Sequence, residues 1–217
     1  MLSSDVYYDE CSVILADKKR YTSCYCEENV YRLVAALPPP HERLSCAVFI
    51  SNTARSCALW QQRSTASWNS PVFWDYHVIG VSGSPPAALV WDLDSTLPWP
   101  CPLATYISAT FGPGTIQARD TGPIDLRLTS HYPRFRVVAA VDFVNRFSSD
   151  RRHMRDSNGR WLAPPPSSPA LRGSLAASDH ELPRYWTMDA GDNDPAWLGR
   201  LADITDLDAV IDALTRE

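Results

Sequence analysis

Residues 72–94 read VFWDYHVIGVSGSPPAALVWDLD, and this stretch decides the fold class. It holds two runs of aromatic and β-branched residues, 72–82 and 88–94, on either side of the turn sequence Gly83–Pro86. Two such runs around a turn rich in glycine and proline predict a β-hairpin. Shorter runs of the same character predict further strands at 46–51, 57–62 and 135–141. The chain is therefore expected to build a mainly antiparallel sheet.

A helix is predicted directly after the sequence TSCYCEE at 22–28. Its apolar residues have the spacing of one helix face: Val30, Leu33, Val34 and Leu37. The prolines Pro38–Pro40 end this helix, because proline has no N–H to continue the helical hydrogen bonds. The start of the helix then falls near Cys24–Cys26, with Glu27 and Glu28 in the first turn, where acids suit the helix dipole.

Two more helices are expected in the second half of the chain. A short one at 142–147 begins with Asp142, and a last one is capped by Thr205 and Asp208. The apolar stripe of the last helix consists of Leu207, Val210, Ile211 and Leu214. Residues 101–133 have weak patterning and predict no element. A first helix followed by strands of an antiparallel sheet indicates an α+β fold.

The composition narrows the class of protein. A chain of 217 residues, 45% of them hydrophobic, is long enough to bury a core as one domain. Its net charge of -5 argues against nucleic acid as a partner, which would need a basic face. The sequence has no apolar stretch of the roughly 20 residues that span a membrane, and its start lacks the pattern of a signal peptide. We therefore expect a cytoplasmic, possibly also nuclear, protein whose six cysteines are reduced and mostly buried, as Cys46 is within its strand.

The predicted hairpin brings a histidine and a carboxylate together. If Gly83–Pro86 is a four-residue loop, Ser82 pairs with Ala87 and, counting back, His77 lies opposite Asp92. Directly opposed residues have Cβ atoms about 5 Å apart, so this carboxylate can hold the imidazole. A histidine held in this way keeps its other ring nitrogen free to act as a base.

The same alternation places the other polar and aromatic residues of the hairpin. Asp75 shares the face of His77, and the pairing sets it opposite Asp94. Trp74 and Trp91 point to the other face, so we expect both in the core.

A cysteine at the start of the first helix is a candidate nucleophile for this histidine. The unpaired N–H groups of a helix start favour a thiolate. Glu27 and Glu28 would raise the thiol pKa if they lay close, but we expect them to turn to solvent, so that an imidazolium and the helix end prevail. Helix placement alone does not choose between Cys24 and Cys26. A purely structural histidine stays open, as does a zinc site of Cys24, Cys26, His77 and Asp92, although Cys-x-Cys lacks the usual zinc spacing.

Six motifs, in order, resemble the protein N-terminal glutamine amidohydrolase family: YTSCYCEEN, VFISN, VFWDYHV, WDLDSTLPWPC, FRVVAAVDFVNRFSSDRRHM and SNGRWLAPPP. They cover residues 21–169, whereas 1–20, 111–133 and 170–217 follow the family pattern weakly. The resemblance implies a papain-like or transglutaminase-like α+β fold without cofactor or metal. We expect a single catalytic domain over 1–217, with 1–20 as an N-terminal extension.

The resemblance also implies a reaction and the residues that perform it. It places the nucleophile on Cys26, the histidine on His77 and the acid on Asp92. The implied reaction removes the side-chain amide of an N-terminal glutamine through a thioester. It gives glutamate and ammonia, and an N-degron pathway can arginylate the new N-terminal glutamate.

Recognition of an N-terminal glutamine requires a partner for its α-ammonium group. Asp75 and Asp94 are candidates because of their place on the hairpin. Asp150 is a third, within the polar segment Ser149–His153, which either lines the site or forms a surface cluster of salt bridges. A thiol peptidase or acyl transferase with the same trio stays open, as does a non-catalytic binder of N-terminal residues. A monomer is the default.

Overall fold

A computed structural model of the chain describes residues 21–37, 41–65, 67, 70–112, 115–118, 122–189 and 194–215. The expected extension at 1–20, the prolines Pro38–Pro40 and Cys11 lie outside the described residues. Within the described part, no helix combines the length and the apolar character that crossing a bilayer needs.

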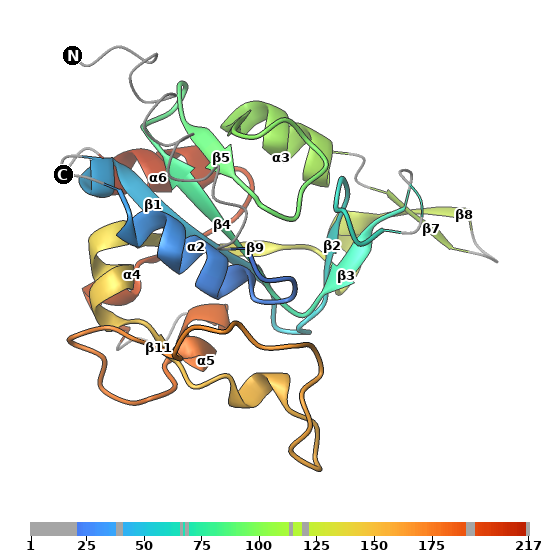
Figure 1. Cartoon of the computed structure of the whole chain (residues 1–217). Helices are drawn as coiled ribbons and strands as arrows, with labels where there is room; N and C mark the ends of the chain where they lie inside the picture. The colour runs from blue at the N-terminus through green and yellow to red at the C-terminus, as the bar shows by residue number, and fades with distance from the viewer. Residues whose placement is uncertain are drawn as a thin grey trace.

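The centre of the molecule is a six-stranded sheet in which each pair of neighbouring strands is antiparallel (Figure 1). Its order is β12 (Arg200–Ala202), β9 (Arg134–Ala139), β1 (Ser45–Ser51), β4 (His77–Ser82), β5 (Leu89–Trp91) and β6 (Cys101–Pro102). Three two-stranded sheets lie outside it: β2 (Cys57–Leu59) with β3 (Val72–Trp74), β7 (Thr115–Ala118) with β8 (Gly122–Asp125), and β10 (Ser148–Ser149) with β11 (Leu171–Arg172).

Helices cover both faces of the central sheet (Figure 1). One face packs against α2 (Cys26–Ala35), α4 (Ala140–Arg146) and α5 (Leu182–Trp186), and the other against α3 (Leu103–Phe111) and α6 (Leu207–Thr215). Short 3-10 helices complete the described chain: η2 (His41–Leu44), η3 (Leu126–Leu128), η4 (Arg152–Met154) and η5 (Ala196–Leu198). The prediction of an α+β fold with an antiparallel sheet is confirmed.

The strand β1 explains how one sheet supports two cores. All seven of its residues are buried. Ala47 and Phe49 join the core beneath α2, whereas Val48 and Ile50 join the core beneath α3 and α6, because side chains alternate along a strand. Cys46 is fully buried, as its strand pattern predicted.

The predicted first helix is confirmed. It runs over Cys26–Ala35 and ends before the prolines, and its predicted apolar stripe is buried against the sheet. The turn before it is held by Asn29, whose side chain accepts a hydrogen bond from the Thr22 N–H and donates one to the Thr22 carbonyl. Cys24 adopts a left-handed conformation in this turn, with φ of 68°.

The hairpin forms, but its predicted register is wrong. Ser82 pairs with Leu89 rather than Ala87, because the connection between the strands is longer than the four residues expected. The error is two residues, so each side chain stays on its predicted face of β4 and β5. The first run is also not one strand: it breaks after Trp74, and β4 starts only at His77.

Three further boundaries differ from the prediction. Helix α4 starts at Ala140, so Asp142 lies in its first turn instead of beginning it. Helix α6 starts at Leu207, and Asp206 immediately precedes it, which leaves Thr205 too far back to pair with Asp208 as a cap. The second predicted strand stops at Leu59. The stretch without a predicted element contains α3, whose Tyr106 is fully buried.

Candidate active site

Cys26 is the first residue of α2 and is partly exposed. The backbone N–H of Val78 in β4 lies against its sulfur and lowers the thiol pKa. Val78 follows His77 directly, so the start of α2 lies beside the start of β4. Cys24 is exposed, and its sulfur lies 3.6 Å from the Ser23 hydroxyl. The two cysteines therefore have different surroundings.

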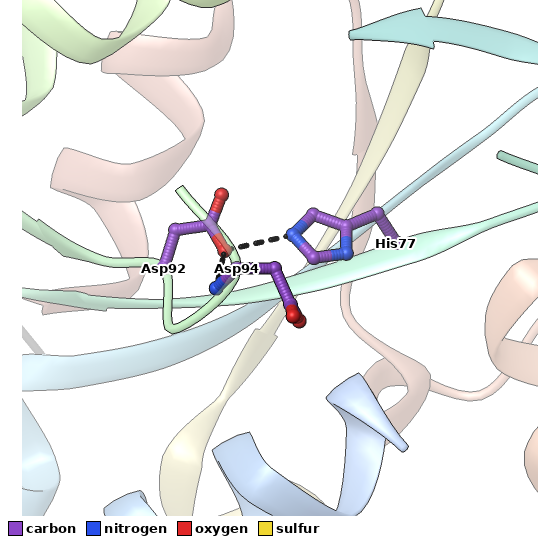
Figure 2. Close-up of side chains that lie close together, drawn as sticks. All are labelled: His77, Asp92 and Asp94. Atoms are coloured by element: carbon purple, nitrogen blue, oxygen red, sulfur yellow. Dashed lines mark hydrogen bonds and ion pairs between the residues drawn. The ribbon is translucent and has the colours of Figure 1, made fainter. Parts of the chain in front are cut away.

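His77 and Asp92 are in contact, although they are not a directly opposed pair of the hairpin. The His77 Nε2 atom lies 2.9 Å from Asp92 Oδ1, and both side chains are buried (Figure 2). Strand β5 ends at Trp91, so Asp92 leaves the strand and reaches His77 from the following turn. This contact leaves Nδ1 as the ring nitrogen that Asp92 does not engage.

Burial and charge act in opposite directions on this pair. Burial alone would lower the pKa of His77, but the charge and the hydrogen bond of Asp92, together with Asp94 and Glu27, raise it above its ordinary value. Burial would likewise raise the pKa of Asp92, but His77 and the hydrogen bond from Tyr106 lower it. The pair therefore keeps Asp92 ionised and makes the His77 ring a stronger base than a free imidazole.

Three donors besides His77 hold the Asp92 carboxylate. The Tyr106 hydroxyl donates to Oδ2 at 2.8 Å, the Gln62 amide donates to Oδ2 at 3.2 Å, and the Asp94 N–H donates to Oδ1 at 2.9 Å. Sequence reasoning missed Tyr106 and Gln62, because both come from stretches whose patterning gives no sign of a site. Only the folded chain brings them to Asp92.

The two acids of the first turn of α2 correct a prediction. Glu27 and Glu28 are both fully buried, whereas the sequence led us to expect them in solvent. Glu28 pairs with Arg151 at 2.9 Å and with Arg32 at 2.7 Å, so its charge is compensated. Glu27 instead faces the site, with its Oε2 3.8 Å from the sulfur of Cys26.

The expected net lowering of the Cys26 pKa is therefore wrong. Burial raises the pKa of this thiol well above its usual value, and the charges of Glu27, Asp94 and Asp92 raise it further. The N–H of Val78 acts in the opposite direction without outweighing them. The surroundings of Cys26 in the free protein therefore favour the neutral thiol.

Glu27 belongs to a buried network that leads away from Cys26. The Tyr76 hydroxyl donates to Glu27 Oε2 at 2.9 Å and lies 3.2 Å from His153 Nε2. His153 Nε2 is also 3.5 Å from Glu27 Oε1, which accepts no hydrogen bond although it is buried. Tyr76 and Glu27 stand within the quoted motifs, so their presence was visible in the sequence but their contact was not.

The sequence left open whether the polar segment Ser149–His153 lines the site or forms a surface cluster of salt bridges. In the structure some of its residues do the first and others the second. His153 lies at the network of Glu27, and Arg151 is buried against Glu28. Asp150 is on the outer side, where it accepts hydrogen bonds from Arg152 and lies 3.2 Å from His180 Nδ1. Asp150 makes no contact with Cys26 or His77.

Two hairpin residues differ from their predicted places. Asp75 does not share a face with His77, because the chain bends between β3 and β4; its side chain is 58% exposed and pairs with Arg55 at 2.8 Å. Trp74 is only partly buried and its ring stacks on the His77 ring with centroids 6.1 Å apart, so it covers the imidazole. Trp91 is buried in the core beneath α2, as predicted.

Asp94 lies next to the pair and is partly exposed. Its carboxylate turns away from that of Asp92 (Figure 2), and its Oδ1 accepts a hydrogen bond from the Tyr21 hydroxyl. Burial and Asp94 raise the pKa of Tyr21 to about 12, so this phenol stays a donor. Asp94 is the one predicted α-ammonium partner that the fold brings to His77.

His77, Asp92 and Asp94 are the described residues whose possible metal-ligating atoms come together, within 4.8 Å of one another. The set contains no cysteine, so the zinc site with Cys24 and Cys26 is not assembled. The Nε2 of His77 and both oxygens of Asp92 are already engaged in hydrogen bonds. The donor set therefore fits a hydrogen-bonded pair better than a metal centre.

The fold and this site define a class: an α+β protein with a thiol at the start of one helix and a histidine–carboxylate pair at the ends of two strands. A sequence model of the N-terminal glutamine amidase family matches residues 21–211. The chain belongs to this family of enzymes.

Relatives from animals and a plant support this membership. The protein N-terminal glutamine amidohydrolase of Caenorhabditis elegans is 36% identical over 172 residues, which cover 79% of this chain and 88% of the relative. That of Drosophila ananassae is 40% identical over 176 residues, with 79% and 80% covered. That of Arabidopsis thaliana is 40% identical over 192 residues, with 82% and 79% covered.

Proposed function

We propose that this protein hydrolyses the side-chain amide of an N-terminal glutamine of peptides and proteins. Membership of the family and the activity named for its relatives support the reaction. One observation supports the residues: the Cys26 sulfur lies against the N–H of Val78, next to His77, whose Nε2 is held by Asp92. In this proposal Cys26 is the nucleophile, His77 the base and Asp92 the residue that orients it.

The reaction proceeds in two halves. His77 takes the thiol proton on Nδ1, and the thiolate of Cys26 attacks the amide carbon of the glutamine side chain. The backbone N–H of Cys26, which has no acceptor within the helix, donates to the oxyanion. The imidazolium then gives its proton to the leaving ammonia, which leaves a γ-glutamyl thioester. In the second half His77 takes a proton from water, and the resulting hydroxide hydrolyses the thioester to glutamate.

The proposal also places the chain among hydrolases of papain-like or transglutaminase-like fold. A thiol at a helix start, packed on an antiparallel sheet that carries the histidine and its acid, supports this. The chain acts as one catalytic domain, since the C-terminal strand β12 pairs with β9 and Arg151 binds the first turn of α2. The N-terminal glutamate that it produces is the form that an N-degron pathway takes up for arginylation.

Cys26→Ala tests the nucleophile. Removal of the thiol lowers turnover of a Gln-initiated peptide by several orders of magnitude, because no other group forms the thioester. Cys24→Ala is the matched control, since that thiol is exposed and lies apart from the site, and it keeps nearly full activity. Ammonia release and the mass change of the peptide are the measurements. Nearly normal ammonia release by Cys26→Ala would disprove the assignment.

Peptides with an internal glutamine test the reaction class. Hydrolysis confined to N-terminal glutamine supports the amidohydrolase, whereas equal release from internal glutamine, or transfer to an added amine, would identify an acyl transferase. Cleavage of the backbone would identify a peptidase.

A further inference from the structure

Negative charge surrounds Cys26 without a matching cation. Glu27 is fully buried 3.8 Å from the sulfur, and Asp94 and Asp92 also raise the pKa of the thiol. Asp92 has its partner in His77, but within the described part of the chain neither Glu27 nor Asp94 pairs with an arginine or lysine. Among the described residues, His153 is the basic side chain within ion-pair distance of Glu27, at 3.5 Å. The free site therefore holds excess negative charge.

Glu27 has the features of an uncompensated buried acid. Its Oε1 accepts no hydrogen bond, and its Oε2 is shared between the Tyr76 hydroxyl and the Cys26 thiol. A buried carboxylate beside a thiol opposes ionisation of that thiol, since the repulsion between two negative charges is weakly screened away from water. Because no surface of Glu27 is exposed, it acts on the site through Cys26 and does not contact a ligand.

Asp94 is the acid that a ligand can reach. It is partly exposed, and one of its oxygens is fixed by the Tyr21 hydroxyl. Its second oxygen accepts no hydrogen bond from a described residue. The α-nitrogen and the amide carbon of a glutamine are separated by four bonds, and so by roughly 5 Å at most. A carboxylate oxygen of Asp94 lies within 4.8 Å of a ring nitrogen of His77, so a residue this short can hold its α-nitrogen at Asp94 with its side-chain amide still close to the histidine.

We propose that Asp94 binds the α-ammonium group of the N-terminal glutamine, and that this positive charge is the switch that lets Cys26 lose its proton. The inference rests on the proposed function and adds a cause for its specificity. Without a substrate, burial and the charge of Glu27 keep the thiol protonated and unreactive. A docked α-ammonium neutralises Asp94 and offsets Glu27, so thiolate forms where the substrate is present. A blocked or internal glutamine brings no charge and meets an inert thiol.

Deamidation of matched peptides is the first test. Wild-type enzyme prefers a Gln-initiated peptide to its N-acetylated form, and Asp94→Asn reduces this preference at least about tenfold, mainly by raising KM. Asp142→Asn is the control, because Asp142 is a half-exposed acid of α4 paired with Arg146, and it leaves the preference unchanged. Asp75→Asn tests the other hairpin acid. If Asp75→Asn loses the preference for the Gln-initiated peptide and Asp94→Asn keeps it, the proposal is overturned.

Alkylation of Cys26 by iodoacetamide at neutral pH is the second test, with the other cysteines as internal references. A Gly-initiated peptide supplies an α-ammonium without a side chain over the sulfur, so it speeds alkylation of wild-type Cys26 at least about threefold, whereas its N-acetylated form does not. In Asp94→Asn, Cys26 is alkylated somewhat faster than in wild type without peptide, and the Gly-initiated peptide does not speed its alkylation further. Glu27→Gln reacts fast without peptide but keeps the wild-type KM for the Gln-initiated peptide, which a merely structural residue would not do.

The outcomes separate this inference from the proposed function. If wild-type enzyme does not deamidate Gln-initiated peptides, the proposed function fails. If it does, but the N-acetylated peptide reacts equally well, the inference alone fails. Unchanged or slower alkylation with a Gly-initiated peptide, at concentrations that inhibit deamidation, also overturns the inference. The peptide comparison and the alkylation experiment both use the wild-type chain here, so their outcomes do not depend on the folding of a variant.

Discussion

Asp92 illustrates how one buried residue depends on its surroundings. Its carboxylate accepts hydrogen bonds from Tyr106, Gln62 and the Asp94 backbone, and it holds His77. A buried charge without such donors would be costly, because removal from water is offset only by well-formed partners. The pair is thus both part of the site and a contributor to stability.

This pair gives stability a defined pH dependence. The folded-state pKa of Asp92 is lowered, so its contribution is present above the unfolded value of about 4 and is lost as pH falls through the folded value. The folded-state pKa of His77 is raised. Its contribution to the free energy of unfolding is therefore complete below pH about 6.5 and is lost as pH rises through the folded-state pKa. The gap in unfolding free energy between wild type and Asp92→Asn is therefore largest between these limits.

Urea unfolding from pH 3 to 9 measures that gap. We expect about 3–5 kcal/mol at its maximum, since one partner of a buried pair is removed, and a smaller gap at both ends. Asp142→Asn, a change at a half-exposed helix acid, serves as control and differs from wild type by less than about 0.5 kcal/mol throughout. A gap that does not change with pH would contradict the charged pair.

At the scale of elements, the start of α2 is tied to a distant loop. Glu28 in the first turn binds Arg151, and Arg151 also donates to the carbonyl oxygens of Pro166, Ser168 and Pro169. Arg151 adopts a left-handed conformation, with φ of 65°, so a residue in a strained backbone state is held by these contacts. The helix that presents Cys26 is thereby fixed to the C-terminal third of the chain.

Glu28→Gln tests this connection. It leaves the buried guanidinium of Arg151 without its carboxylate, so we expect a loss of about 3–5 kcal/mol in unfolding free energy. Asp156→Asn is the control: Asp156 pairs with an exposed arginine four residues on, and loss of such a pair costs at most about 1 kcal/mol. Chemical denaturation measures both. Equal effects of the two variants would show that Glu28 contributes no more than a surface acid.

Local patterns predicted most elements but not their details. The stripe of α2 and the runs of β1, β9 and α6 gave correct elements, because burial of one face imposes a period on the sequence. The hairpin register failed because its connection has no turn signal that fixes a length. Helix α3 was missed, since it lies where the sequence shows only weak patterning.

At the scale of the whole molecule, the sheet depends on helices from both ends of the chain. Ile211 of α6 is fully buried against the face of the sheet opposite α2. Since β1 contributes side chains to both cores, loss of packing in one core also destabilises the other through this shared strand.

Ile211→Ala tests whether the chain unfolds as one unit. The cavity costs about 2–5 kcal/mol, and we expect thermal transitions followed by tryptophan fluorescence and by exposure of the Cys46 thiol to shift together. Leu128→Ala is the control, because Leu128 is 83% exposed, and it changes stability by less than about 0.5 kcal/mol. Two separate transitions would show that the chain does not form a single cooperative domain.

The sequence by itself determined the α+β class, the main strands and helices, and the family, because these depend on local periods and on motifs that survive in order. It also named Cys26, His77 and Asp92, the trio that the proposed mechanism uses. The tertiary structure decided which acids face the sulfur. Glu27 was placed in solvent from sequence, yet the packing of Tyr76 and His153 buries it beside Cys26. A residue at a helix start has no periodic signal for its direction, so only contacts between distant segments could set the charge around the thiol.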